Sequence, residues 1–176
     1  MNTLQIDLLV KRVISSRAHF LGVFARDQVP LNSEHSEFCY IANIEDSSKP
    51  GMHWVAFYFT HRGGSIVCEF FDSYAQSPLV YGFEHVTHCT NVLSRPVQAL
   101  NSDACGHHCI YFCVSRSYGY SSAYIRSLYY ARTLHENDSF VQNYVFRLAR
   151  RLFCMLSSVC ASAQCQCCSL RSIVQQ

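Results

Sequence analysis

Residues 53–60 form an apolar stretch in which both alternating sets of side chains are hydrophobic, and no other segment constrains the fold as strongly. One set is Trp54, Ala56 and Tyr58, and the other is Val55, Phe57 and Phe59. Because successive side chains of a strand point to opposite faces of the sheet, this pattern predicts a central strand that is covered on both faces.

A hairpin turn is predicted directly after this strand, at residues 61–64, and residues 65–71 are predicted to return as its antiparallel partner. His53 stands at the start of the first strand, and Asp72 follows the end of the second, nineteen residues later. The hairpin is therefore expected to bring His53 and Asp72 to the same edge of the sheet. Glu69 is the competing carboxylate, but it lies three residues earlier and points to the opposite side of the pleat.

Residues 98–113 are the second informative stretch, in which the polar residues 101–103 give way to an apolar run. This order predicts a loop that caps the N-terminus of a helix. Cys105 then lies in the first helical turn, where unpaired backbone N–H groups and the positive end of the helix dipole stabilise a thiolate. A cysteine in such a run is more often a small buried hydrophobic residue, which we expect of Cys109 and Cys113.

The remaining periodicity predicts helices over residues 3–17, 122–134 and 138–156, the last with Asn137 or Asp138 as its N-cap. Strands are predicted at residues 38–44 and within 87–93. The length fits one domain, for which we predict residues 1–156. Residues 157–176 are rich in Ser, Cys and Gln, and we expect a disordered tail there.

The composition is that of a globular protein, and the net charge of +2 does not by itself indicate nucleic-acid binding. The number of cysteines, eleven, is odd, and the first thirteen residues lack the apolar core of a signal peptide. We therefore expect an intracellular protein whose thiols are mostly reduced. No apolar run reaches the roughly 18 residues of a membrane span, so no membrane association is expected.

Metal binding is the rival class of function. Candidate ligands are His85, His88 and Cys89, then Cys105 and Cys109 with His107 and His108, and the C-terminal thiols Cys160, Cys165, Cys167 and Cys168. None of these groups contains the two paired Cys-x-x-Cys motifs of a structural zinc site, so we predict no metal site.

Together, these segments resemble the adenovirus-type cysteine proteases, the adenain family. The likeness rests on His53-Trp54 in a strand, on Asp72, and on Gln98 seven residues ahead of Cys105-Gly106. Residues 20–22 and 39–43 are also similar to the N-terminal region of that family, so the resemblance covers most of residues 1–155. SUMO proteases share the order His, Asp, Gln, Cys, whereas residues 101–106 favour the viral branch. Adenains often have Glu where this chain has Asp72.

The resemblance implies an α+β fold in which a central mixed sheet carries His53 and Asp72 and packs against a buried helix that begins at Cys105. It implies that Cys105 is the nucleophile, that His53 is its ion-pair partner, and that Asp72 orients the imidazole. Gln98 would supply the side-chain donor of the oxyanion hole. Gly51 and Trp54 are the residues expected to bind substrate.

The activity implied is hydrolysis of viral, or virus-derived, structural precursor proteins next to small residues such as Gly. A protease for SUMO or ubiquitin-like proteins is the first alternative, and a catalytically inactive relative that binds such partners is the second. The resemblance implies a monomer that needs no cofactor for its chemistry but is stimulated by a short peptide and by polyanions such as DNA. The basic face of Arg147, Arg150 and Arg151 is the candidate for weak DNA binding. The host nucleus and the virion are the implied locations.

Overall fold

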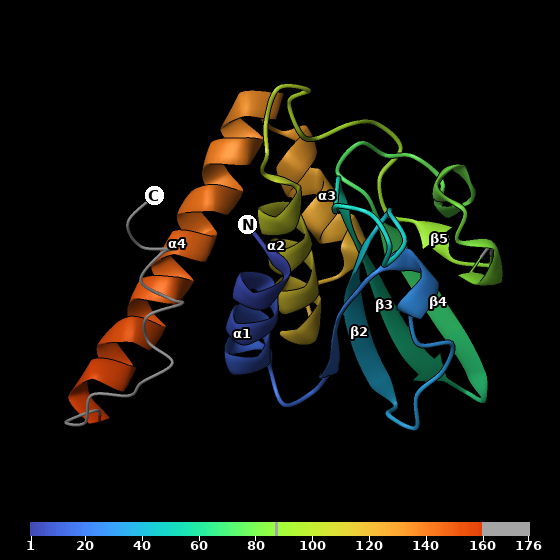
Figure 1. The fold of residues 1–176 in the computed structure, drawn as a ribbon, viewed down its shortest axis with the longest axis horizontal. Helices are drawn as coiled ribbons and strands as arrows, with labels where there is room; N and C mark the ends of the chain where they lie inside the picture. The colour runs from blue at the N-terminus through green and yellow to red at the C-terminus, as the bar shows by residue number, and fades with distance from the viewer. Residues whose placement is uncertain (87, 160–176) are drawn as a thin grey trace.

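A five-stranded mixed sheet forms the centre of the computed structural model, which describes residues 1–86 and 88–159 (Figure 1). The strands are β1 (His19–Phe24), β2 (Glu37–Asn43), β3 (Trp54–Arg62), β4 (Ser65–Phe71) and β5 (Thr90–Asn91), and they lie in that order. The two outer pairs, β1–β2 and β4–β5, are parallel, whereas β3 is antiparallel to both of its neighbours.

Four α-helices accompany the sheet in the described part of the chain: α1 (Thr3–Val13), α2 (Cys105–Ser117), α3 (Ser122–Tyr130) and α4 (Leu134–Val159). They gather on one side of the sheet, and α2 lies between the sheet and α4 (Figure 1). The predicted α+β class, with a mixed sheet packed on a buried helix that starts at Cys105, is confirmed. None of the helices within residues 1–86 and 88–159 is both long and apolar enough to cross a membrane.

Strand β3 is covered on both faces, as its sequence predicts. Tyr58 faces the helices and contacts Phe112 of α2 edge to face, with ring centroids 6.3 Å apart. Phe57 faces the other way and contacts Phe83, at 5.2 Å, in a second core that the segment between β4 and β5 closes. Because both cores bury aromatic rings against β3, the position of the β3–β4 hairpin is fixed from two sides.

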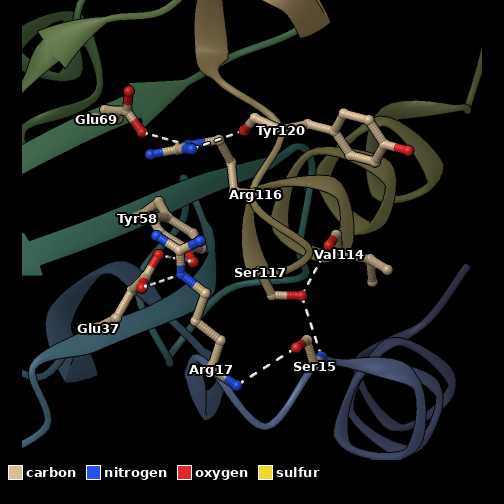
Figure 2. A network of polar contacts seen from close by, with 9 residues as sticks. All are labelled: Ser15, Arg17, Glu37, Tyr58, Glu69, Val114, Arg116, Ser117 and Tyr120. Atoms are coloured by element: carbon tan, nitrogen blue, oxygen red, sulfur yellow. Dashed lines mark hydrogen bonds and ion pairs between the residues drawn. The ribbon is translucent and has the colours of Figure 1, made fainter.

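Figure 2 shows how the C-terminal end of α2 is tied to the sheet. Arg116 donates to Glu69 of β4 at 2.6 Å, and its guanidinium lies over the ring of Tyr58, 4.8 Å from the centroid. The Tyr58 hydroxyl donates to Glu37 of β2 at 2.7 Å, and Arg17 donates to the other oxygen of that carboxylate at 2.8 Å. These contacts hold one end of α2 and leave its N-terminal end at the sheet edge where β3 begins and β4 ends.

Several boundaries differ from the predicted ones. Strand β3 extends through Arg62, and the turn is the pair Gly63-Gly64, both with positive φ (56° and 82°), instead of residues 61–64. Two residues with positive φ match the right-handed twist of a tight hairpin, which is why glycines stand there. The strand predicted within 87–93 is reduced to Thr90–Asn91, and Thr87 lies outside the described residues.

The predicted start of the last helix is also wrong, whereas the helices predicted from residues 3 and 122 begin there. Helix α4 begins at Leu134 because Thr133 and Glu136 form a capping box: the Thr133 hydroxyl accepts from the Glu136 N–H, and the Glu136 carboxylate accepts from the Thr133 N–H. The N-cap prediction for Asn137 or Asp138 is therefore wrong, since both lie buried inside the helix. Helix α4 continues to Val159, three residues past the predicted end of the domain, and residues 160–176 of the predicted tail lie outside the described residues.

A disulfide between Cys68 of β4 and Cys89 joins the sheet to the segment that precedes β5. The other five cysteines that the structure describes are free thiols: Cys39, Cys105, Cys109, Cys113 and Cys154.

Candidate active site

His53 and Asp72 meet at one edge of the sheet. His53 immediately precedes β3 and Asp72 immediately follows β4, so the antiparallel pairing of these strands brings the two side chains together. The imidazole Nε2 lies 2.6 Å from Asp72 Oδ1, and both side chains are buried.

The Asp72 carboxylate has no remaining freedom because four donors surround it. Oδ1 accepts from His53 and from the Tyr74 N–H at 3.1 Å, and Oδ2 accepts from the Gln76 N–H at 2.8 Å and the Tyr81 hydroxyl at 3.0 Å. The turn that wraps this carboxylate contains Ala75 at φ 57°, the one positive-φ residue other than glycine in the described chain. A backbone held in this sparsely populated region is typical of functional sites.

The His53 imidazole stacks on Tyr74, with ring centroids 4.8 Å apart, and contacts the Cys105 side chain. Since Nε2 is bound to Asp72, the nitrogen that faces Cys105 is Nδ1. Burial alone would lower the pKa of His53, but the hydrogen bonds with Asp72 and Cys105 outweigh it and raise the pKa to about 9. The imidazole is therefore positively charged at neutral pH.

Cys105 is the first residue of α2. Burial alone would raise the pKa of its thiol, but the hydrogen bond with His53 and the positive charge of the imidazolium outweigh burial and hold this pKa below its usual value. Gly106 lets the start of α2 lie close to Ile6 and Trp54, since a Cβ there would lie 3.2 Å from the Ile6 side chain and 3.4 Å from the Trp54 side chain. The site thus favours a thiolate–imidazolium pair.

The helix start differs from the predicted cap. Ala104 is the N-cap and makes no side-chain capping bond, and the Ser102 hydroxyl accepts the Ala104 N–H instead of an N–H of the helix. The first N–H groups of α2 are therefore free of side-chain caps, which suits an anion at Cys105.

Gln98 is buried, and both ends of its amide are fixed. Its Oε1 accepts from the Ser73 hydroxyl at 2.6 Å, and its Nε2 donates to the Ser102 carbonyl at 2.8 Å. An amide nitrogen carries two hydrogens, so one N–H of Gln98 remains for a ligand. Ser73 follows Asp72 directly, so one turn orients both the imidazole and the amide. The sequence pattern did not point to Ser73, because serines are common in turns after strands.

A cavity of about 500 Å³ brings these groups together, since His53, Gln98 and Cys105 all line it. Gly51 and Trp54, the predicted substrate-binding residues, line it as well. A side chain at position 51 would require Asn43 to shift, because a Cβ there would lie 2.6 Å from the side-chain amide nitrogen of Asn43. Gly51 itself is exposed and lines the cavity, so its backbone is accessible to an extended peptide.

The other candidate residues lie elsewhere. Arg147, Arg150 and Arg151 are exposed on α4 and do not line the cavity.

In the part of the chain that the structure describes, one group of side chains has the spacing of a metal site: Cys68, His88 and Cys89. The two sulfurs of that group are joined in the disulfide and are not thiolate ligands. His107 and His108 do not join Cys105 and Cys109 in such a group, and the four C-terminal cysteines are outside the described residues.

Comparison with known proteins gives a structural likeness. No family model and no curated protein matches the sequence. The crystal structure of ASFV pS273R protease superposes with a TM-score of 0.56 at 17% identity, over 80% of this chain and 65% of that one. This likeness shows that the chain shares the fold of that protease. It spans about 65% of the length of that protease. A selenomethionine crystal structure of the same protease matches with a TM-score of 0.45 and 23% identity, over 64% of this chain and 43% of that one.

Proposed function

We propose that this chain is a cysteine endopeptidase whose nucleophile is Cys105. The observation that carries this proposal is the convergence of a thiol of lowered pKa, an imidazole of raised pKa and a fixed amide donor on one cavity. Each of these features is common alone, but their combination is the set that acyl transfer from an amide requires. The fold that this chain shares with a protease also supports the proposed peptidase activity.

In the proposed mechanism, the Cys105 thiolate attacks the scissile carbonyl carbon, and the carbonyl oxygen becomes an oxyanion. The free N–H of Gln98 and the backbone N–H of Cys105 donate to that oxyanion. The imidazolium of His53 gives its Nδ1 proton to the leaving amine, which leaves a thioester on Cys105. Neutral His53 then takes a proton from water, the resulting hydroxide attacks the thioester, and the thiolate is regenerated with the carboxylic acid product. Asp72 keeps the imidazole in place during both steps.

We propose viral or virus-derived structural precursor proteins as substrates, cut beside small residues such as Gly. Support comes from the sequence resemblance to adenains and from the viral origin of the protease with the similar fold. Gly51 has no side chain and lines the same cavity as Trp54, which also suits a substrate with little side-chain bulk near the cut. A SUMO or ubiquitin-like protein is the alternative substrate.

The regulation implied by the resemblance extends this proposal. We expect a monomer in the host nucleus and in virions that needs no cofactor for its chemistry but responds to an activating peptide and to DNA. Arg147, Arg150 and Arg151 are exposed along α4, which supports α4 as the surface for the polyanion.

One experiment separates the candidate functions. Reduced, purified protein is incubated with a panel of Gly-containing peptides and with a ubiquitin-like vinyl sulfone, and Cys105→Ala serves as the matched control. Peptide cleavage that the control lacks supports the endopeptidase, and adduct formation with the vinyl sulfone favours the ubiquitin-like alternative. A folded wild-type protein that does neither is an inactive relative, and cleavage by Cys105→Ala would refute the proposed nucleophile.

A further inference from the structure

A second buried His–Asp pair lies next to the candidate active site but does not line its cavity. His108 is on α2, one turn after Cys105, and Asp138 is on α4. The imidazole Nε2 lies 2.8 Å from Asp138 Oδ1. His108 is fully buried and Asp138 is 6% exposed. Burying a carboxylate is costly unless it is fully hydrogen-bonded. The hydrogen-bond partners of Asp138 therefore show which segments it keeps in place.

The direction of each hydrogen bond in this cluster follows from the protonation states. Burial lowers the pKa of His108 in spite of Asp138, so the imidazole is neutral, and burial raises the pKa of Tyr129 well above its usual value, so its hydroxyl keeps its proton. The Tyr129 hydroxyl therefore donates to His108 Nδ1 at 3.1 Å, and His108 Nε2–H donates to Asp138. Burial would also raise the pKa of Asp138, but hydrogen bonds from His108, Ala99 and Ser102 outweigh it and keep this pKa low.

The other side of the Asp138 carboxylate holds the loop that carries Gln98. Its Oδ2 accepts from the backbone N–H of Ala99 at 3.2 Å, and the Ser102 side chain also hydrogen-bonds to the carboxylate. Ser102 is the residue whose carbonyl accepts from Gln98 Nε2 at 2.8 Å. Asp138 thus binds the residue after Gln98 and the residue that orients the Gln98 amide.

The opposite side of this loop is held by Ser73. The Ser73 carbonyl accepts from the N–H groups of Val97 and Gln98, at 2.9 and 3.3 Å, and the Ser73 hydroxyl donates to the Gln98 side chain. The loop is therefore clamped between Ser73 on the sheet side and Asp138 on the helix side. The contacts of Ser73 reach Val97 and Gln98, whereas Asp138 is the residue that holds the Ala99 N–H and the Ser102 side chain.

We propose that Asp138, oriented by His108, is a positioning residue that sets the Gln98 amide for oxyanion stabilisation. This inference rests on the proposed function. Neither residue lines the cavity, so Asp138 does not contact a substrate there and reaches Gln98 through its bonds to Ala99 and Ser102. Oxyanion stabilisation depends on the donor distance, and a displacement of about 1 Å costs on the order of a hundredfold in rate.

The test compares Asp138→Ala with Asp138→Asn. Alanine removes both acceptors, and we expect kcat to fall by roughly tenfold to a hundredfold while KM and the rate of Cys105 alkylation stay at wild-type values. The side-chain oxygen of an asparagine can still accept from the Ala99 N–H. Its NH₂ can donate to His108 Nε2, provided that the neutral imidazole carries its proton on Nδ1. Asp138→Asn should therefore retain more activity than Asp138→Ala. A control is Tyr58→Phe, which removes a buried hydrogen bond at the far end of α2 (Figure 2) and should leave kcat unchanged.

A double-mutant cycle shows whether Asp138 acts through Gln98. Gln98→Ala removes the donor that Asp138 positions, so adding Asp138→Ala to it should cause no further loss of kcat. If Asp138→Ala multiplies the loss by the same factor in both backgrounds, or slows Cys105 alkylation as much as hydrolysis, the proposal is wrong.

Amide hydrogen exchange keeps the inference testable if the wild-type protein cleaves no peptide and the proposed function fails. Asp138→Ala should speed exchange in residues 97–104 while α2 and α4 remain as protected as in the wild type. Unchanged exchange in residues 97–104 would show that Asp138 does not hold the loop. Faster exchange over the whole chain would show that Asp138 serves only the stability of the fold.

Discussion

Asp72→Asn should lower the pH at which peptide hydrolysis fails on the alkaline side. The substitution keeps the size of the side chain but removes the charge beside His53 Nε2, 2.6 Å away. The rise of the His53 pKa from 6.5 to about 9 corresponds to about 3 kcal/mol in favour of the imidazolium. Among the contacts that raise this pKa, the hydrogen bond to Asp72 is larger than that to Cys105. We therefore expect the variant to lose roughly half of this energy or more, which is at least about one pH unit.

The direction of this pH shift follows from the roles of the charged and the neutral imidazole of His53. His53 donates the proton to the leaving amine, so hydrolysis by the wild type should fall as pH rises through about 9. Alkylation of Cys105 by iodoacetamide needs only the thiolate and should not fall there. In Asp72→Asn the alkaline limb of hydrolysis should move to about pH 8 or lower, because burial, which disfavours the charged imidazole, is then less opposed.

The assay measures kcat/KM for a peptide substrate and the alkylation rate of Cys105 between about pH 5 and 10, in the wild type and in Asp72→Asn. A matched control is Asp27→Asn, which removes an exposed carboxylate that hydrogen-bonds to Ser47 outside the cavity. An alkaline limb that stays at the same pH in Asp72→Asn would refute Asp72 as the source of the raised His53 pKa. A wild-type alkylation rate that falls together with hydrolysis would refute the assignment of that limb to His53.

Other expected results concern the nucleophile, the amide and the domain boundary. Substoichiometric iodoacetamide at about pH 6, where an ordinary thiol is protonated, should label Cys105 first by peptide mapping and spare Cys109, whose pKa is raised by burial; His53→Ala should erase the preference. Gln98→Ala should lower kcat by roughly 10²- to 10³-fold with little change in thermal stability, and an effect on KM alone would assign Gln98 to substrate binding. Ser73→Ala should lower kcat by a smaller factor, since the Ser102 carbonyl still holds the amide nitrogen. Removing residues 160–176 should leave hydrolysis unchanged, and a truncated protein that fails to fold would show that the domain extends further.

Local patterns in the sequence determined the frame of the site. The apolar run of residues 53–60, the turn after it and the return strand at residues 65–71 predict the hairpin, and with it the meeting of His53 and Asp72, because strand geometry sets which residues share a sheet edge. The apolar run after residue 104 predicts the helix that places Cys105 at its N-terminus. In both cases the determining residues are neighbours along the chain, so no distant contact is needed to infer the arrangement.

Only the tertiary structure decided the partners of the buried polar groups. The sequence offers Asp138 as one of two candidate helix caps and His108 as one candidate ligand of a metal site that it does not predict, yet the two pair across 30 residues and hold the Gln98 loop. Ser73 looks like an ordinary turn residue until the fold brings it to Gln98, 25 residues away. A polar side chain on the surface forms its hydrogen bonds with water, so its neighbours in the sequence are enough to predict its environment. Inside the protein it must bond to whatever the fold brings within reach, and that depends on how distant segments pack.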